Sequence, residues 1–245
     1  LYKQSLKILD KAKELAVQNE EKNLAYEIVE LEKVIESQYI TRSMSSRADE
    51  LTIQAKELSS QNVIASKLSN LSLQLYSIIL KTGYVKSAEE SKEVTDYFKA
   101  RLPKYKIQNL GFREKLWLYN AYLWYSFLMQ DFKNCYKYAS KWVDLFYENP
   151  SMISLNPVFF LKGNNYLLES MFYVKNRRGF REALQKLEHI VTDDKFPKND
   201  NLEVLIFHYK YSSKINLHFL EGTFEEGLHL EKEIIDGIKL HSDKL

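Results

Sequence analysis

Few side chains in this sequence have the types and spacing that catalysis or metal binding requires. The five histidines never form an HExxH motif, which would place two zinc ligands and a general base on one helix face. His218 and Glu221 are one helical turn apart, a two-ligand spacing that also arises by chance. The pair Asp193 and Asp194 lacks the further acidic residue of a DDxxD run and precedes Pro197, which indicates a solvated loop. We therefore predict no metal site.

Nucleophilic and cofactor chemistry are equally poorly supported. Cys135 is the only cysteine, so the chain cannot form an internal disulfide or a cysteine-rich zinc site. It lies one turn after Phe132 on a predicted helix, which favours a packing role over that of a nucleophile. The sequence contains no GxGxxG or GK[ST] loop for phosphates. We predict no catalytic residue and no cofactor. The alternative, an enzyme on an α/α scaffold, would need converging acids or a metal.

A short basic cluster could bind an anion. Lys175, Arg177, Arg178 and Arg181 bridge two predicted helices and could contact an acidic partner or a phosphate backbone. A solvated turn is the simpler interpretation. The whole chain balances 35 basic against 33 acidic side chains, for a net charge of +2, so it has no long-range field that attracts polyanions. We predict no nucleic-acid partner.

The apolar segments are too short to predict a membrane crossing. The most apolar stretch, residues 116–129, contains Asn120 and Ser126 and is shorter than a bilayer requires. We expect no membrane insertion and, with one cysteine, a reducing, cytoplasmic location. The chain begins at Leu1 without a leader pattern, so we expect a fragment of a longer chain.

The elements that must position these residues are helices. Only 7 glycines and 4 prolines interrupt the chain, and apolar residues recur at spacings of three and four. The fold class is therefore predicted to be all-α, with a single domain over residues 1–245. Helices are expected at 2–18, 21–40, 44–59, 62–81, 87–101, 112–129, 132–148, 157–174, 180–192, 201–220 and 224–240.

Evenly spaced residues predict a repeat. Pro103, Pro150 and Pro197 are 47 residues apart, and each is expected just beyond a helix end. Small residues recur as anchors, five of the six with a large residue three positions earlier, which would let antiparallel helices approach closely. These anchors are Ser5, Ala48, Ala88, Cys135, Ala183 and Gly227.

Helix-start signals agree with this phase. An N-cap oxygen followed three residues later by a carboxylate occurs at Ser87 with Glu90, Asp200 with Glu203, and Thr223 with Glu226. Asn156 before Pro157 predicts a further helix start.

The repeat resembles the tetratricopeptide family. The order of that family's second helix is followed by Gln130, Asp131, Phe132, Cys135, Ala139 and Pro150, by Gly179, Phe180 and Ala183, and by Gly222, Thr223, Phe224 and Gly227. The anchors are 40 to 48 residues apart rather than 34, and large residues stand where first helices should have small ones. The aromatic-rich middle is similar to uncharacterised helical-repeat proteins of Bacteroidota. The resemblance implies a right-handed α–α superhelix, a solenoid of about five to six antiparallel hairpins.

In that family the first helices line a concave groove that binds peptides. The resemblance implies a groove formed by Asn70, Trp117, Asn120, Trp124, Asn165, Phe172, Ser212 and Asn216. Aromatic residues at helical spacing are also typical of a core, and an unpaired amide is costly in one, so the asparagines are the stronger candidates. We expect a non-enzymatic scaffold that binds a protein or peptide partner. The alternative is a sensory or regulatory repeat segment of a larger signalling or transcription-regulator chain.

Overall fold

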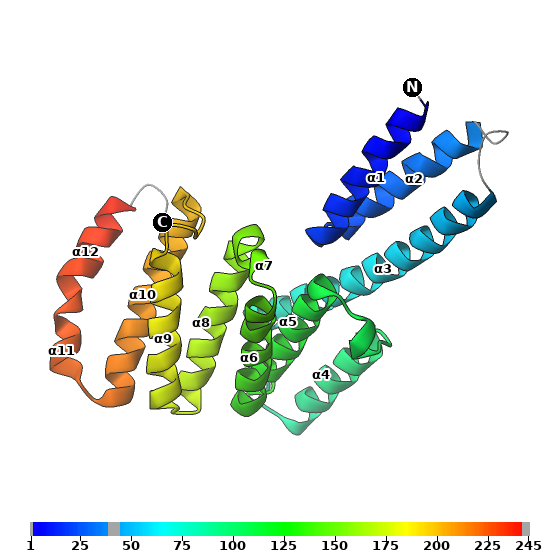
Figure 1. Ribbon diagram of the computed structural model, residues 1–245. Coiled ribbons are helices and arrows are strands. Elements are labelled where there is room, and N and C mark those ends of the chain that lie inside the picture. The colour runs from blue at the N-terminus through cyan, green and yellow to red at the C-terminus, as the bar shows by residue number, and fades with distance from the viewer. Residues whose placement is uncertain (1, 39–44, 242–245) are drawn as a thin grey trace. The chain divides into compact units, whose positions relative to one another are not determined.

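The computed structural model describes residues 2–38 and 45–241, and this part of the chain contains helices and no strand (Figure 1). The all-α prediction is confirmed. The helices are α1 (Tyr2–Gln18), α2 (Lys22–Gln38), α3 (Ser45–Thr82), α4 (Ala88–Arg101), the 3-10 helix η2 (Ile107–Asn109), α5 (Phe112–Leu128), α6 (Phe132–Glu148), α7 (Ser151–Leu155), α8 (Pro157–Tyr173), α9 (Arg177–Thr192), α10 (Asp200–Glu221), α11 (Phe224–Leu228) and α12 (Leu230–Leu240).

One turn geometry recurs along the chain. A residue with left-handed backbone follows the end of a helix at Glu20, Gly83, Gln130, Lys175 and Gly222. At three of these turns, those at positions 20, 130 and 175, its N–H bonds to the carbonyl three residues earlier, and the next N–H bonds to the carbonyl five residues earlier. This pair of bonds is the Schellman motif, which satisfies carbonyls at a helix end and reverses the chain. Each turn therefore joins the two helices of a repeated hairpin.

The chain divides into two compact units. Unit 1 comprises Leu1–Gln74 and Glu93–Ala121, and unit 2 comprises Leu75–Lys92 and Tyr122–Leu245. Helices α3, α4 and α5 each contribute to both units. The expectation of a single repeat domain stays a prediction.

Unit 1 combines small apolar clusters with buried charges. Ala16, Ala25 and Ile28 join α1 to α2, and a second cluster around Val29 and Leu51 joins α2 to α3. The fully buried carboxylate of Glu32 receives Lys13 Nζ at 2.6 Å and Arg47 at 3.1 Å, from helices on either side. These ion pairs fix the three helices in register, because a buried charge without its partner is very costly.

A second buried ion pair joins two distant segments of unit 1. Lys22 Nζ, at the start of α2, lies 2.9 Å from a carboxylate oxygen of Glu114 in α5. The same oxygen of Glu114 accepts the backbone N–H of Gly111 at 2.8 Å. Glu114 therefore both caps the start of α5 and holds it to α2.

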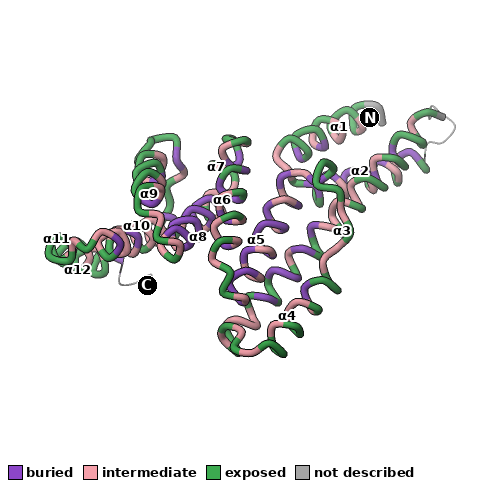
Figure 2. Tube along the Cα trace, turned by 90° about the horizontal axis from the view of Figure 1, so that it is seen from below, coloured by how far each residue is buried: buried purple, intermediate pink, exposed green. Residues whose placement is uncertain are grey.

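Unit 2 has an aromatic core. Its largest fully buried side chains are Trp142, Phe146, Phe160 and Phe180, and the rings of Phe146 and Phe160 meet edge to face at 5.6 Å. Gly163 of α8 lies directly against the Trp142 ring, since a Cβ at this glycine would come within 2.7 Å of Trp142 Cδ1. The small residue thus lets α6 and α8 approach closely. Figure 2 shows buried residues along α8, and Figure 1 shows α6, α8, α9 and α10 as neighbouring rods.

Several predicted helix boundaries are wrong. The separate helices expected at 44–59 and 62–81 are one helix, α3, because buried residues such as Leu51, Ala55, Ala65 and Leu68 keep one helical seam, with no Gly or Pro to interrupt it. The helix expected at 224–240 is divided at His229 into α11 and α12. Helix α7 was not predicted. The helix end expected at residue 40 and the helix start expected at residue 44 lie outside the described residues.

The small residues predicted as anchors of helix contacts are buried in only part of the chain. Cys135 is fully buried, and Ala183 and Gly227 are half-buried, but Ser5, Ala48 and Ala88 are exposed. Ser5 and Ala48 lie on α1 and α3, the first helices of their hairpins. In the first hairpin the buried small residue is instead Ala25, on the second helix, α2. A small side chain can stand on a solvent-facing surface as readily as at a contact, so spacing alone gave the wrong residue there.

The helix stops and starts are mostly as predicted. Each of the three evenly spaced prolines lies just beyond a helix end: Pro103 follows α4, Pro150 follows α6 and Pro197 follows α9. Ser87 Oγ accepts the N–H of Glu90 at 3.1 Å, and Pro157 opens α8. Two caps differ: Asn199 rather than Asp200 caps α10, and the Thr223 hydroxyl bonds to His218 instead of capping α11.

One described helix is long and apolar enough to cross a membrane. This is the Ser46–Thr82 stretch of α3, of which 28% of the most apolar window is buried. The sequence had indicated a different stretch, 116–129, as the most apolar. Length and composition are weak evidence of insertion, and the expectation of no membrane insertion stays a prediction.

Candidate binding surface

The residues with potential chemistry occupy structural positions. Cys135 is fully buried, and burial together with Asp131 and Glu169 raises the pKa of its thiol to about 12. Such a thiol is protonated at neutral pH and is a poor nucleophile. His218 Nδ1 lies 2.8 Å from Thr223 Oγ1 rather than facing a group of ligands. In residues 2–38 and 45–241, no three His, Cys, Asp or Glu side chains gather as a metal site.

The acidic pair of the predicted loop is solvated. Asp193 caps the end of α9 and accepts the backbone N–H of Lys195 at 2.8 Å. Asp194 is almost fully exposed and pairs with Lys198 at 3.1 Å. Both carboxylates therefore serve the turn between α9 and α10.

Three of the groove residues implied by the resemblance lie in unit 1. Asn70 is exposed on α3, and Trp117 is half-buried on α5. Asn120 is buried, and its side-chain oxygen accepts a hydrogen bond from Ser72 Oγ at 2.8 Å. The cost of an unpaired amide is therefore no reason to place Asn120 on a binding surface, because tertiary packing supplies its partner.

The other five groove residues lie in unit 2. The half-buried ring of Trp124 meets those of Tyr76 at 4.6 Å and Tyr166 at 5.3 Å, so much of its surface is used in packing. Asn165 and Phe172 on α8 and Ser212 and Asn216 on α10 are all half-buried. All five come from first helices of hairpins in this unit.

One side of α8 gathers most of these features. Its opposite side is buried, from Phe160 and Leu161 to Ser170 and Met171. The remaining residues follow the spacing of a single helical stripe, and most are half-buried. We call this stripe the α8 face: Lys162, Asn165, Tyr166, Glu169, Phe172 and Tyr173.

The α8 face contains a carboxyl group in an aromatic setting. Burial raises the pKa of Glu169, and a hydrogen bond with Tyr173 lowers it in part. Burial also raises the pKa of the Tyr166 hydroxyl, helped by Tyr209, Glu169 and Tyr76 nearby. Helices α3 and α10 thus bring the hydroxyl groups of Tyr76 and Tyr209 near that of Tyr166 on α8.

Sequence reasoning identified only part of the α8 face. It named Asn165 and Phe172 but missed Lys162, Tyr166, Glu169 and Tyr173. One signal in the sequence could have found them. Along 157–173, wholly apolar residues and residues with polar ends alternate at helical spacing, which separates a buried side of the helix from a partly exposed side.

The α8 face combines side chains of several chemical kinds. It pairs aromatic rings with amide, hydroxyl and carboxyl groups, the mixture that is enriched in protein interfaces. Comparisons of the whole chain with protein-family profiles, with curated proteins and with solved structures found no match.

Proposed function

We propose that this chain is a protein-interaction module whose α8 face, with Ser212 and Asn216 of α10, holds a peptide segment or a helix of a partner protein. The observation that carries the proposal is the half-buried stripe of aromatic and amide groups on α8, whose other side packs in the aromatic core. A stripe anchored in this way is rigid, so a ligand would not have to order it on binding.

The proposal includes a tetratricopeptide-like arrangement. It holds that the hairpins stack as a right-handed superhelix with their first helices on the concave side. The repeated left-handed turn at positions 20, 83, 130, 175 and 222 supports repetition of one hairpin unit. Concave stacking would present the α8 face and the neighbouring face of α10 to the same ligand.

Peptide-display selection against the full chain tests this function. Selected peptides are labelled, and their affinity is measured by fluorescence anisotropy against Phe172→Ala and Asn216→Ala variants. We expect each substitution to weaken binding by about tenfold or more, as for interface residues that contribute over 1.4 kcal/mol.

Matched controls lie outside the surface. Leu155→Ala on α7 removes another partly exposed apolar side chain, and Asn201→Ala on α10 removes an exposed amide. We expect both to bind as the parent chain does. Selected peptides that bind equally well to all four variants would exclude the α8 face as the binding surface.

A further inference from the structure

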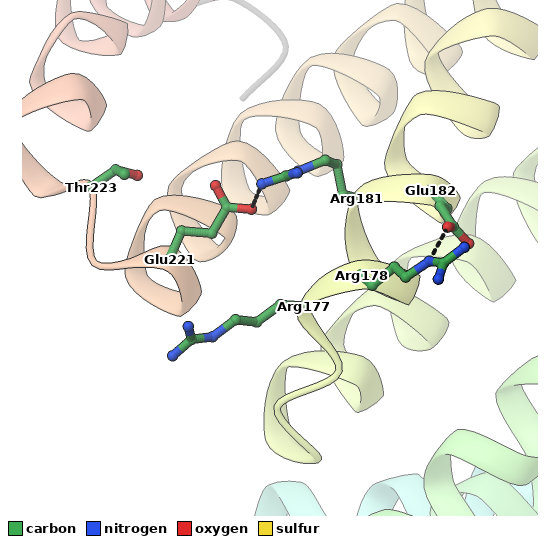
Figure 3. A pocket seen from close by; sticks show the side chains of 6 residues that line it. All are labelled: Arg177, Arg178, Arg181, Glu182, Glu221 and Thr223. Atoms are coloured by element: carbon green, nitrogen blue, oxygen red, sulfur yellow. Dashed lines mark hydrogen bonds and ion pairs between the residues drawn. The ribbon is translucent and has the colours of Figure 1, made fainter.

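Unit 2 contains a cavity that is lined mainly by charged side chains and that includes no residue of the α8 face. It has a volume of about 730 Å3 and lies beside the start of α9 and the turn between α10 and α11 (Figure 3). Its lining residues are Arg177, Arg178, Arg181, Glu182, Glu221 and Thr223. We call it the arginine pocket. The sequence had indicated its three arginines, with Lys175, as a basic cluster, for which a solvated turn was the simpler interpretation.

The three guanidinium groups differ in their partners. Arg181 is paired with Glu221, and Arg178 Nε lies 2.8 Å from Glu182. The side chain of Arg177 has no hydrogen-bond or ion-pair partner among the residues that the structure describes. In Figure 3 this side chain extends on the side of Glu221, whereas Arg178 turns toward Glu182. One cation of the pocket is thus free to bind a ligand.

The existing ion pairs do not close the pocket. Side chains of Arg178 and Glu182 are 89% and 61% exposed, and a pair so exposed to solvent contributes little to stability. Arg178 can therefore change partners at small cost. Arg181 is also more than half exposed, although its partner Glu221 is more buried.

The charges at the start of α9 oppose the helix dipole. Its first turn has two arginines and no acidic residue, whereas the first turns of α4 and α10 each contain two acidic residues. The amino end of a helix carries partial positive charge, so cations there are unfavourable and anions are stabilised. A bound anion would offset both the helix end and the clustered guanidinium groups.

The lining favours a carboxylate over a phosphate chain. Glu182 and Glu221 stand in the wall and would repel a dense row of phosphates, and the net charge of +2 gives no field that attracts a polyanion. Planar guanidinium groups pair with carboxylates through two parallel hydrogen bonds. We propose that the arginine pocket binds an acidic segment of a protein, through Asp or Glu side chains that pair with Arg177 and with the N–H groups of Arg181 that Glu221 does not use. This inference rests on the proposed function only in taking the ligand to be a protein segment.

Fluorescence anisotropy with a labelled hexapeptide that carries two glutamates among serine and glycine residues tests the pocket, using the full chain at constant salt. We expect saturable binding that Arg177→Glu and Arg181→Glu each weaken by about tenfold or more, because charge-assisted hydrogen bonds are lost. The matched control is Lys133→Glu, which reverses an exposed charge on α6 of the same unit. Circular dichroism checks that each variant is folded.

Three results would count against the arginine pocket as a site for an acidic segment. No binding, or an equal loss in Lys133→Glu, would overturn the proposal. Tighter binding of a matching phosphoserine peptide or of a single-stranded RNA decamer would overturn the choice of an acidic segment. Display-selected peptides that lose affinity with Phe172→Ala but not with Arg177→Glu would leave the proposed function standing. If the acidic hexapeptide also fails with the parent chain, the arginine pocket alone is rejected.

Discussion

Unit 1 and unit 2 are built from similar helical hairpins but are held together by different forces. Unit 1 buries charged groups: Glu32 with Lys13 and Arg47, and Glu114 with Lys22. Unit 2 buries rings, with Trp142 and Phe160 completely inaccessible, and the ion pairs among its described residues are at partly exposed positions. Apolar and aromatic packing is non-directional and tolerant, whereas a buried ion pair requires particular partners in particular places.

The difference shows how one repeated turn can serve two kinds of core. The left-handed residue is Glu20 in unit 1 and Gln130 or Lys175 in unit 2, with the same pair of backbone bonds. The turn sets the antiparallel path, and the side chains then decide whether charge pairing or ring packing holds the helices together. Each of the following changes tests one side of this comparison.

The largest effect is expected in the aromatic core of unit 2. Trp142→Ala should lower the free energy of unfolding by about 3–5 kcal/mol, because it leaves a cavity against Gly163. Denaturant titration measures the loss, and hydrogen exchange locates it. We expect faster exchange in α6 and α8, while α1 and α2 keep their protection. Equal loss in α1 and α2 would show that the units unfold as one and would end the comparison.

Breaking an ion pair should have the next largest effect, in unit 1. Lys22→Met leaves the buried Glu114 carboxylate without its cation and should cost about 3 kcal/mol. Adding Glu114→Gln removes the stranded charge and keeps an acceptor for the N–H of Gly111, so most of the loss should be recovered. Denaturant titrations of the single and double variants make this test. A double variant as unstable as the single one would contradict charge pairing as the main force there.

Small-residue contacts should matter only where the structure buries them. Cys135→Leu overpacks a fully buried site and should cost about 1–3 kcal/mol. The control is Ala88→Leu at an exposed position, which should stay within about 0.5 kcal/mol of the parent chain. Thermal unfolding of both variants measures these two changes in stability. Similar losses would mean that position in the repeat, rather than burial, sets the requirement for a small side chain.

The smallest expected effect concerns the carboxyl group of the α8 face. Burial raises the pKa of Glu169 above its ordinary 4.5, so the folded chain keeps this proton to a higher pH than the unfolded chain does. Its contribution to stability is complete below pH 4.5 and is lost as pH rises through the folded pKa. Relative to Glu169→Gln, the parent chain should therefore become less stable as pH rises from below 4.5 through the folded pKa of Glu169. Denaturant titrations at several pH values measure this difference, and a constant difference would contradict it.

Much of the fold was predictable because its signals are local. Apolar spacing, the helix end before each of Pro103, Pro150 and Pro197, and the Ser87 and Pro157 helix starts each depend on residues within a few positions of one another. The break expected near residue 60 failed because tertiary contacts of Leu51, Ala55 and Leu68 carry one helix across a polar stretch. The small side chain of Ala88 gave no sign that it faces solvent.

The candidate surfaces were less predictable, because they depend on which side of a helix is covered. Asn120 was expected in a groove, and only the fold shows that Ser72, far away in sequence, pairs with its amide. The free guanidinium of Arg177 lies in a pocket that Glu221 and Thr223, from outside α9, help to line.

The sequence by itself determined an all-helical chain with repeated hairpins, since helix periodicity and helix-ending residues act over short distances. Tertiary structure alone decided which small residues are buried, which charges are paired and which rings remain partly exposed. Burial depends on segments far apart along the chain, as with Lys22 and Glu114, and no local pattern encodes that meeting.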